Sequence, residues 1–147
     1  MKKIIISTLF SIVYVFCAAQ SESDIFGEWF NEEKDAVVTI YKEDNSISGK
    51  TTWLKEPLDS KGNAKLDLKN PDEKLRSRKR MGLKIMHSFK YNDQENIWEN
   101  GRIYDPKKGK LYGGTASLVN ENELKLKGYI ISMPFLGRTA TWTRKTN

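Results

Sequence analysis

Residues 96–131, "NIWENGRIYDPKKGKLYGGTASLVNENELKLKGYII", show most clearly the pattern from which the fold is predicted. Apolar and polar side chains alternate along this stretch, which is typical of β-strands with one buried face. Three such runs follow one another, at residues 96–104, 110–119 and 123–131. The connections between them are short and rich in Asn, Asp, Pro and Gly, so they join sequential strands into antiparallel hairpins.

The same pattern extends to both sides of this stretch. It predicts eight strands, at residues 26–31, 36–43, 46–55, 83–91, 96–104, 110–119, 123–131 and 137–144. Eight hairpin-linked strands favour an all-β fold, a single up-and-down antiparallel barrel, because closing the sheet removes its unpaired edges. A barrel of this size holds either side chains or one small ligand, and alternation alone leaves both alternatives open.

One long interruption, residues 56–82, separates the third and fourth strands. It includes "KNPDEKLRSRKR", residues 69–80, which begins like a helix: Asn70 can cap, Pro71 suits the first helical position, and Glu73 can reach back to the cap. We expect a short helix at residues 71–77, and the segment to be either a lid over the barrel mouth or a structural flap.

The interruption also carries the surplus charge. Residues 55–80 contain nine Lys or Arg and five Asp or Glu, an excess of four. A cluster within it could contact an anionic envelope surface, and consists of Arg76, Arg78, Lys79 and Arg80. The segment lacks the interleaved aromatic residues on which nucleic-acid bases stack, so we expect no nucleic-acid partner.

The first 19 residues resemble a secretory signal peptide. Lys2 and Lys3 precede an apolar run that is too short to span a membrane, and Ala18-Ala19 suits cleavage before Gln20. The prediction is an exported protein, periplasmic or secreted, with the barrel domain at residues 20–147. Cys17 would leave with the peptide, because the bulky Phe16 disfavours lipid attachment at that cysteine.

Several aromatic and polar residues are candidates to line a binding cavity. Trp98, Arg102 and Tyr104 share one face of the strand at 96–104, and the large apolar area of the two aromatics favours that face pointing inward. The opposite phase stays open, since a shift of one residue reverses every side chain. Trp53 and His87, on neighbouring strands, complete the expected ligand-binding set.

The sequence contains little that indicates a catalytic site or a metal site. His87 is the single histidine, and no Gly-x-Ser-x-Gly motif accompanies any serine. With one His and no Cys after residue 19, we expect no metal and no cofactor. An enzyme that uses carboxylates such as Glu99 or Asp105 is a third hypothesis without a motif behind it.

The tripeptide "GEW", residues 27–29, resembles the Gly-x-Trp signature of lipocalins and the wider calycin group. The resemblance implies that Trp29 packs across the closed end of the barrel beneath an arginine of the last strand. Arg144 or Arg138 would supply that arginine.

A second resemblance covers nearly the whole barrel. "GEWFNEEKDAVVTIYK" (27–42), "SGKTTWLKEPLDSKGNAKLDLKNPDEKLRSRKRMGLKIM" (48–86), "WENGRIYDPKKGKLYGG" (98–114) and "LKGYIISMPFLGRTATWTR" (126–144) resemble, in the same order, the segments of the family called domain of unknown function 2147. The resemblance implies an exported, calycin-like barrel and no established activity. We therefore expect a binding barrel for a small or amphipathic molecule; the alternative is an envelope interaction protein with a filled barrel and a basic contact flap.

Overall fold

The computed structural model describes residues 20–146, so the expected signal peptide with Cys17 lies outside the described residues. The elements are the 3-10 turn η1 (Glu22–Ile25), β1 (Gly27–Phe30), β2 (Ala36–Glu43), β3 (Ser46–Leu54), the 3-10 turn η2 (Glu73–Leu75), β4 (Lys84–Asn92), β5 (Ile97–Asp105), β6 (Lys110–Asn120), β7 (Glu123–Ile130) and β8 (Met133–Arg144). Each expected strand overlaps an observed one, and β8 begins four residues earlier than expected.

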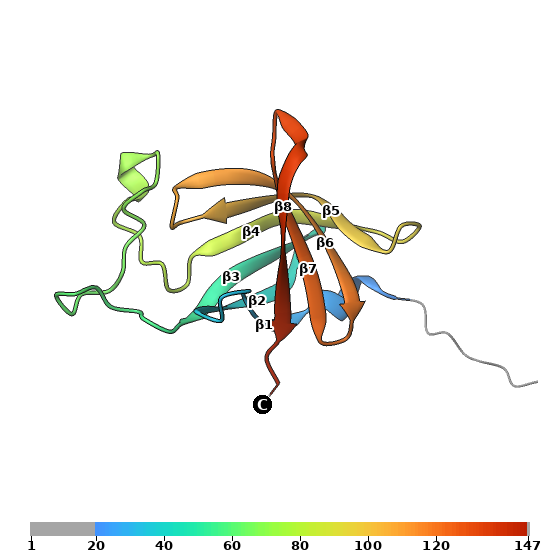
Figure 1. The fold of residues 1–147 in the computed structure, drawn as a ribbon, viewed down its shortest axis with the longest axis horizontal. Coiled ribbons are helices and arrows are strands. Elements are labelled where there is room, and N and C mark those ends of the chain that lie inside the picture. The colour runs from blue at the N-terminus through green and yellow to red at the C-terminus, as the bar shows by residue number, and fades with distance from the viewer. Residues whose placement is uncertain (1–19, 147) are drawn as a thin grey trace, which may run out of the picture.

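The eight strands form one closed antiparallel barrel in chain order (Figure 1). Closure comes from β1 and β8, which pair Trp29 with Arg144 and Phe30 with Thr143. The predicted up-and-down barrel is therefore confirmed. No helix in the described part of the chain is long and apolar enough to cross a membrane.

The core fills one end of the barrel. Its largest fully buried side chains include Trp29, Trp98 and Phe89, and η1 packs beside them through the fully buried Ile25. Successive connections of an up-and-down barrel alternate between its two ends. The loops β1–β2, β3–β4, β5–β6 and β7–β8 therefore lie together at the opposite end, which is here called the open end.

Two strands contain an extra residue that reverses their inward and outward faces. In β4 Ser88 has a φ of 57°, and in β5 Asn100 has a φ of 59°; the β5–β6 register shifts between Trp98 and Gly101. Beyond the β5 irregularity Gly101 faces inward, where a β-carbon would lie 2.3 Å from the Phe89 ring. A bulge of this kind changes which residues face the interior.

The segment between β3 and β4, residues 55–83, is an ordered flap. Within the expected helical segment at 71–77 a single 3-10 turn, η2, forms instead of an α-helix, and its cap is Asp72, whose carboxylate accepts a hydrogen bond from the Lys74 amide at 3.0 Å. Asn70, the expected cap, lies two residues before Asp72: its side-chain oxygen accepts a hydrogen bond from the Asp72 amide at 2.9 Å, and its side-chain NH2 group donates to Asp67 at 2.8 Å. Two isolated bridges, Leu58 with Ala64 and Leu66 with Lys79, hold the rest of the flap.

Candidate functional site

A cavity of about 810 Å³ opens at the end of the barrel opposite the core. Val38, Leu126 and Trp142 line the cavity and also belong to the packed core, so they form its floor. Above the floor the wall is mainly apolar and includes Ile85, Ile103, Tyr112, Gly128 and Ala140. The volume and the lining are typical of a site for one small molecule.

Small inward-facing residues leave space inside the half of the barrel that contains the cavity. At Gly128 an added β-carbon would meet nothing closer than 3.8 Å, whereas at Gly114, its partner on β6, a β-carbon would lie 2.6 Å from the Phe89 ring. The side chain of Phe89 thus fills the barrel beside Gly114. Ala140 on β8 adds a second small side chain on the open side.

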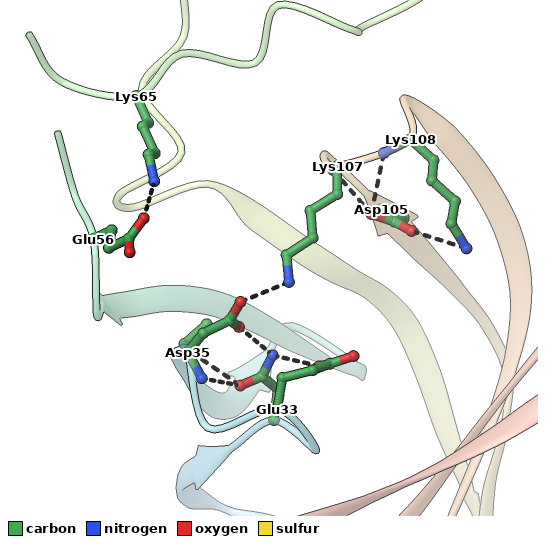
Figure 2. A network of polar contacts seen from close by, with 9 residues as sticks. Glu33, Asp35, Glu56, Lys65, Asp105, Lys107 and Lys108 are labelled. Atoms are coloured by element: carbon green, nitrogen blue, oxygen red, sulfur yellow. Dashed lines mark hydrogen bonds and ion pairs between the residues drawn. The ribbon is translucent and has the colours of Figure 1, made fainter. Parts of the chain in front are cut away.

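Ion pairs surround the mouth of the cavity (Figure 2). Lys107 Nζ lies 2.7 Å from a carboxylate oxygen of Asp35, and the same carboxylate accepts a hydrogen bond from Asn31 at 2.7 Å. Lys65 pairs with Glu56 at 3.0 Å. The Lys107–Asp35 pair connects the β5–β6 loop to the β1–β2 loop, whereas Lys65–Glu56 lies within the β3–β4 segment, which is joined to the β1–β2 loop where the Lys55 amide donates to the Asp35 carbonyl at 2.9 Å.

Asp35 remains charged in this network. Burial acts to raise the pKa of its carboxyl group, but hydrogen bonds from Lys107 and Asn31 outweigh burial and lower the pKa below its ordinary value. Asp35 is therefore an acceptor at neutral pH, and it holds the Lys107 ammonium at the rim.

The mouth carries more basic than acidic side chains. The acidic residues that line the cavity are Glu33, Asp35, Glu56 and Asp105, and the basic ones are Lys55, Lys65, Arg80, Lys107, Lys108 and Arg138. Arg138 pairs with Glu32 on the β1–β2 loop. Lys55 and Arg80 have no acidic partner among the ion pairs of the described residues.

The structure separates the five residues expected to bind a ligand. Trp98 is fully buried in the core at the closed end, where its ring centre lies 5.1 Å from that of Tyr91 and its indole N–H donates to the Glu22 carbonyl at 3.2 Å. Tyr104 borders the cavity, but it points to the face opposite Ile103, and its hydroxyl donates to Asp67 of the flap at 2.6 Å.

The expected inward placement of Arg102, His87 and Trp53 is wrong. Arg102 is exposed and pairs across the sheet with His87, which places both side chains on the outer face. The extra residues at Ser88 and Asn100 are the cause, because each reverses the alternation within its own strand.

Trp53 also lies on the outer surface. Its side chain is 41% exposed, and it contacts Phe30 edge to face, with ring centroids 6.0 Å apart. Its cross-strand partner is Val37, whereas the inward Val38 pairs with Thr51. The register shift between these two pairs separates Trp53 from the cavity.

Trp29 closes the end of the barrel that the core fills. It is fully buried, and the guanidinium carbon of Arg144 lies 4.1 Å from the centre of its ring. Arg144 also donates to the carbonyl oxygens of Phe26 and Asp24, at 2.8 and 2.7 Å. Of the two arginines considered for this position, Arg144 occupies it; Arg138 lies at the open end.

The basic cluster of the flap is largely used within the flap itself. Arg76 donates to the Asn70 carbonyl at 2.8 Å, Arg78 binds the buried carboxylate of Asp67 at 3.1 Å, and Arg80 donates to the Leu66 carbonyl at 3.1 Å. Lys79 is exposed. Contact of this cluster with an anionic partner stays a prediction.

Asp67 attaches the flap to the barrel. Its carboxylate is fully buried and accepts hydrogen bonds from Tyr104, Asn70 and Arg78. Burial and the hydrogen bond to Asp67 raise the pKa of the Tyr104 hydroxyl to about 12. The flap is therefore fixed against β5, where it brings Lys65 and Arg80 to the cavity mouth.

The residues that form the cavity wall were not among the expected set. Ile103, Tyr112, Leu126 and Ala140 line it, together with the rim pair Asp35 and Lys107. One sequence signal was available: Asn100-Gly101 inside a strand, since Asn tolerates the left-handed conformation and so can supply an extra residue there.

The fold is similar to a solved structure, protein HP1028 from the human pathogen Helicobacter pylori, which is described as belonging to the lipocalin family. The TM-score is 0.63 at 20% sequence identity, over 76% of this chain and 73% of that chain, so the likeness concerns the fold alone. No curated protein matches the sequence significantly. The family model "Uncharacterized protein conserved in bacteria (DUF2147)" matches residues 27–144, which is the barrel from the first residue of β1 to the last of β8. The chain belongs to the DUF2147 family.

Proposed function

We propose that this protein is an exported binding protein whose barrel takes up one small amphipathic molecule. The observation that carries the proposal is the cavity of about 810 Å³ with an apolar floor and a charged rim. Apolar surface buried in such a space contributes roughly 25 cal/mol per Å², which is the usual source of affinity for a lipophilic group.

The rim indicates what the polar end of the molecule carries. The lining has six basic and four acidic side chains, so the mouth attracts an anion more strongly than a cation. Lys55 and Arg80 are the cations left without an acidic partner in the described residues. An apolar body with one anionic group fits this arrangement, since a planar guanidinium and an ammonium both bind carboxylate, sulfonate or phosphate oxygens.

Export is part of the proposal and rests on the sequence of residues 1–19. A basic start, a short apolar run and small residues before Gln20 are the features that support it. The absence of further cysteines after residue 19 is compatible with an oxidising compartment, where the fold has no thiol to protect.

The alternative, an envelope protein with a filled barrel and a basic contact flap, has less support. A filled barrel leaves no room for the cavity at its open end. The arginines of the flap also donate to groups within the flap, so fewer of their N–H donors are available to a partner.

Binding can be tested with anilinonaphthalene sulfonate, an apolar fluorophore that carries one anionic group. Ala140→Phe adds a ring to the inward face of β8, and Thr139→Phe adds the same ring to the exposed outer face one residue earlier. We expect the wild-type protein and Thr139→Phe to bind the probe alike, and Ala140→Phe to bind at least about tenfold more weakly, which corresponds to about 1.4 kcal/mol.

Two results would overturn the proposal. One is equal binding by Ala140→Phe and Thr139→Phe while both variants keep the wild-type melting temperature. The other is the absence of any lipophilic molecule in a mass spectrum of the organic extract, combined with no shift in melting temperature on adding lipophilic anions.

A further inference from the structure

The tip of the β7–β8 hairpin, residues 130–136, exposes an unusual amount of apolar surface. Its exposed apolar side chains are Ile130, Ile131, Met133, Phe135 and Leu136, and Phe135 is 79% exposed. Figure 1 shows this tip projecting beyond the neighbouring strands of the barrel. Five adjacent apolar side chains on a projecting hairpin are uncommon on a protein surface unless they bind something.

From Leu124 onward the charges of this hairpin are of one sign. No Asp or Glu occurs between Leu124 and the end of the chain, at residue 147. Lys125 and Lys127 are exposed on the outer face of β7, and neither takes part in the ion pairs found among residues 20–146. Basic side chains on β7 therefore precede the apolar tip in the chain, and they can contact an anionic surface.

The spacing of the two features matches a lipid interface. Lys127 lies three residues before Ile130, which is about 10 Å along an extended strand. Amphipathic elements bury their apolar side chains about 5–10 Å into the boundary between headgroups and acyl chains. With the tip at that depth, the ammonium of Lys127 lies at the level of the phosphates.

From these observations we propose that the β7–β8 tip docks the protein onto a bilayer that contains anionic phospholipid. Phe135 and its apolar neighbours enter the interface, Lys127 binds the lipid phosphates, and Lys125, two residues farther from the tip, adds charge attraction to the anionic surface. A contact between two copies is disfavoured, because five residues are far fewer than the roughly 20–30 per partner of a stable interface.

Docking would also place the cavity at the membrane surface. Ile130 and Leu136 belong both to the tip and to the cavity lining. The mouth therefore opens beside the docked hairpin, and an amphipathic molecule could pass between bilayer and barrel. The docking itself does not depend on the cavity being occupied.

The test is flotation of the purified protein with vesicles of phosphatidylcholine alone, or of phosphatidylcholine mixed with phosphatidylglycerol. We expect the wild-type protein to float with the mixed vesicles. Phe135→Ser should reduce partitioning at least about tenfold, because burial of one such aromatic side chain contributes about 1.5–3 kcal/mol. Val119→Ser is the matched control, since Val119 is 51% exposed but lies near the β6–β7 turn at the other end of the barrel.

Neutralising the lysines tests the electrostatic part separately. Lys125→Gln combined with Lys127→Gln should weaken binding to the mixed vesicles about thirtyfold, since each surface cation contributes about 1 kcal/mol, and the double variant should respond less to salt. Ala140→Phe should float like the wild type, which separates docking from failure of the cavity to bind a ligand.

Three outcomes would overturn the proposal. Phe135→Ser and Val119→Ser could partition equally, or the wild-type protein could fail to float with the mixed vesicles. Alternatively, sedimentation could show a wild-type dimer that Phe135→Ser dissociates, in which case the tip is a contact between copies of the chain. Melting curves of all variants establish that each remains folded.

Discussion

The guanidinium carbon of Arg144 lies 4.1 Å from the centre of the Trp29 ring, and its N–H groups donate to the Phe26 and Asp24 carbonyls. The two residues are also cross-strand partners in the pair that closes the barrel. One side chain therefore covers the buried tryptophan and ties β8 to the segment before β1.

Removal of this side chain should destabilise the barrel. Arg144→Ala loses the cation–π contact and leaves carbonyl groups without their charged donor, so we expect the free energy of unfolding to fall by about 2–4 kcal/mol. Arg138→Ala is the control on the same strand; its exposed ion pair with Glu32 contributes within roughly 1 kcal/mol. Urea unfolding measures both, and equal losses would contradict the proposed role of Arg144.

Tyr104→Phe should loosen the flap. The variant leaves the buried Asp67 carboxylate without the hydroxyl that donates at 2.6 Å, a loss of about 1–3 kcal/mol. Cleavage within residues 55–83 by a protease at low concentration should become faster while the barrel remains intact. In Tyr41→Phe, which removes a hydroxyl with no hydrogen bond among the described residues, cleavage should match the wild type.

Lys55 should contribute to the selectivity of the cavity mouth for anions. It lines the mouth without an acidic partner among the described residues, so Lys55→Gln should weaken binding of anilinonaphthalene sulfonate about threefold to tenfold through the lost charge attraction. Binding of the uncharged phenylnaphthylamine should not change. Lys61→Gln, at an exposed position of the flap that does not line the cavity, is the control; the same loss there would show only a general effect of net charge.

Stability should depend on pH through His87. Burial lowers the pKa of its imidazole below 6.5, the nearby charge of Lys84 lowers it further, and Glu43 partly opposes these effects. Protonation therefore costs more in the folded chain than in the unfolded one, so stability is complete above about pH 6.5 and falls as the pH decreases toward the folded pKa. His87→Gln should flatten this decrease in urea midpoints measured between about pH 7.5 and about pH 5. If the urea midpoint of His87→Gln fell with pH as steeply as that of the wild type, the decrease would come from carboxylates instead of His87.

The barrel could be predicted from the sequence because alternation and short turns determine strand pairing locally. The orientation of β4 and β5 could not, because Ser88 and Asn100 each insert one residue and reverse the faces that follow. Uninterrupted alternation would place Arg102 and His87 in the interior, whereas the two inserted residues turn them outward. From the Glu123–Thr143 pair to the Tyr129–Gly137 pair the register of β7 and β8 does not shift, so the pairs Leu124–Trp142 and Leu126–Ala140 keep one inward phase.

The contacts within the flap could not be predicted from the local sequence. Arg78 and Arg80 are both arginines of the same short run, but Arg78 binds the Asp67 carboxylate and Arg80 binds a main-chain carbonyl. Such partners are determined by how the segment folds back against β5. The place of Asn70 depends on the same fold: its side-chain NH2 group donates to Asp67 and Tyr104, and its side-chain oxygen accepts from the Asp72 amide, so the cap of η2 is Asp72 instead.

The division of the barrel into a filled and a hollow half can be tested with two glycines. At Gly101 a new β-carbon would lie 2.3 Å from the Phe89 ring, so Gly101→Ala forces the ring to move and should cost about 1–3 kcal/mol. At Gly128 the nearest atoms are 3.8 Å away, so Gly128→Ala should leave the urea midpoint nearly unchanged. Neither glycine has a positive φ, so backbone strain does not distinguish them. Gly128→Leu extends farther into the cavity and should remove probe binding without unfolding the chain, whereas a large loss of stability in Gly128→Leu would mean that the open half has no free space.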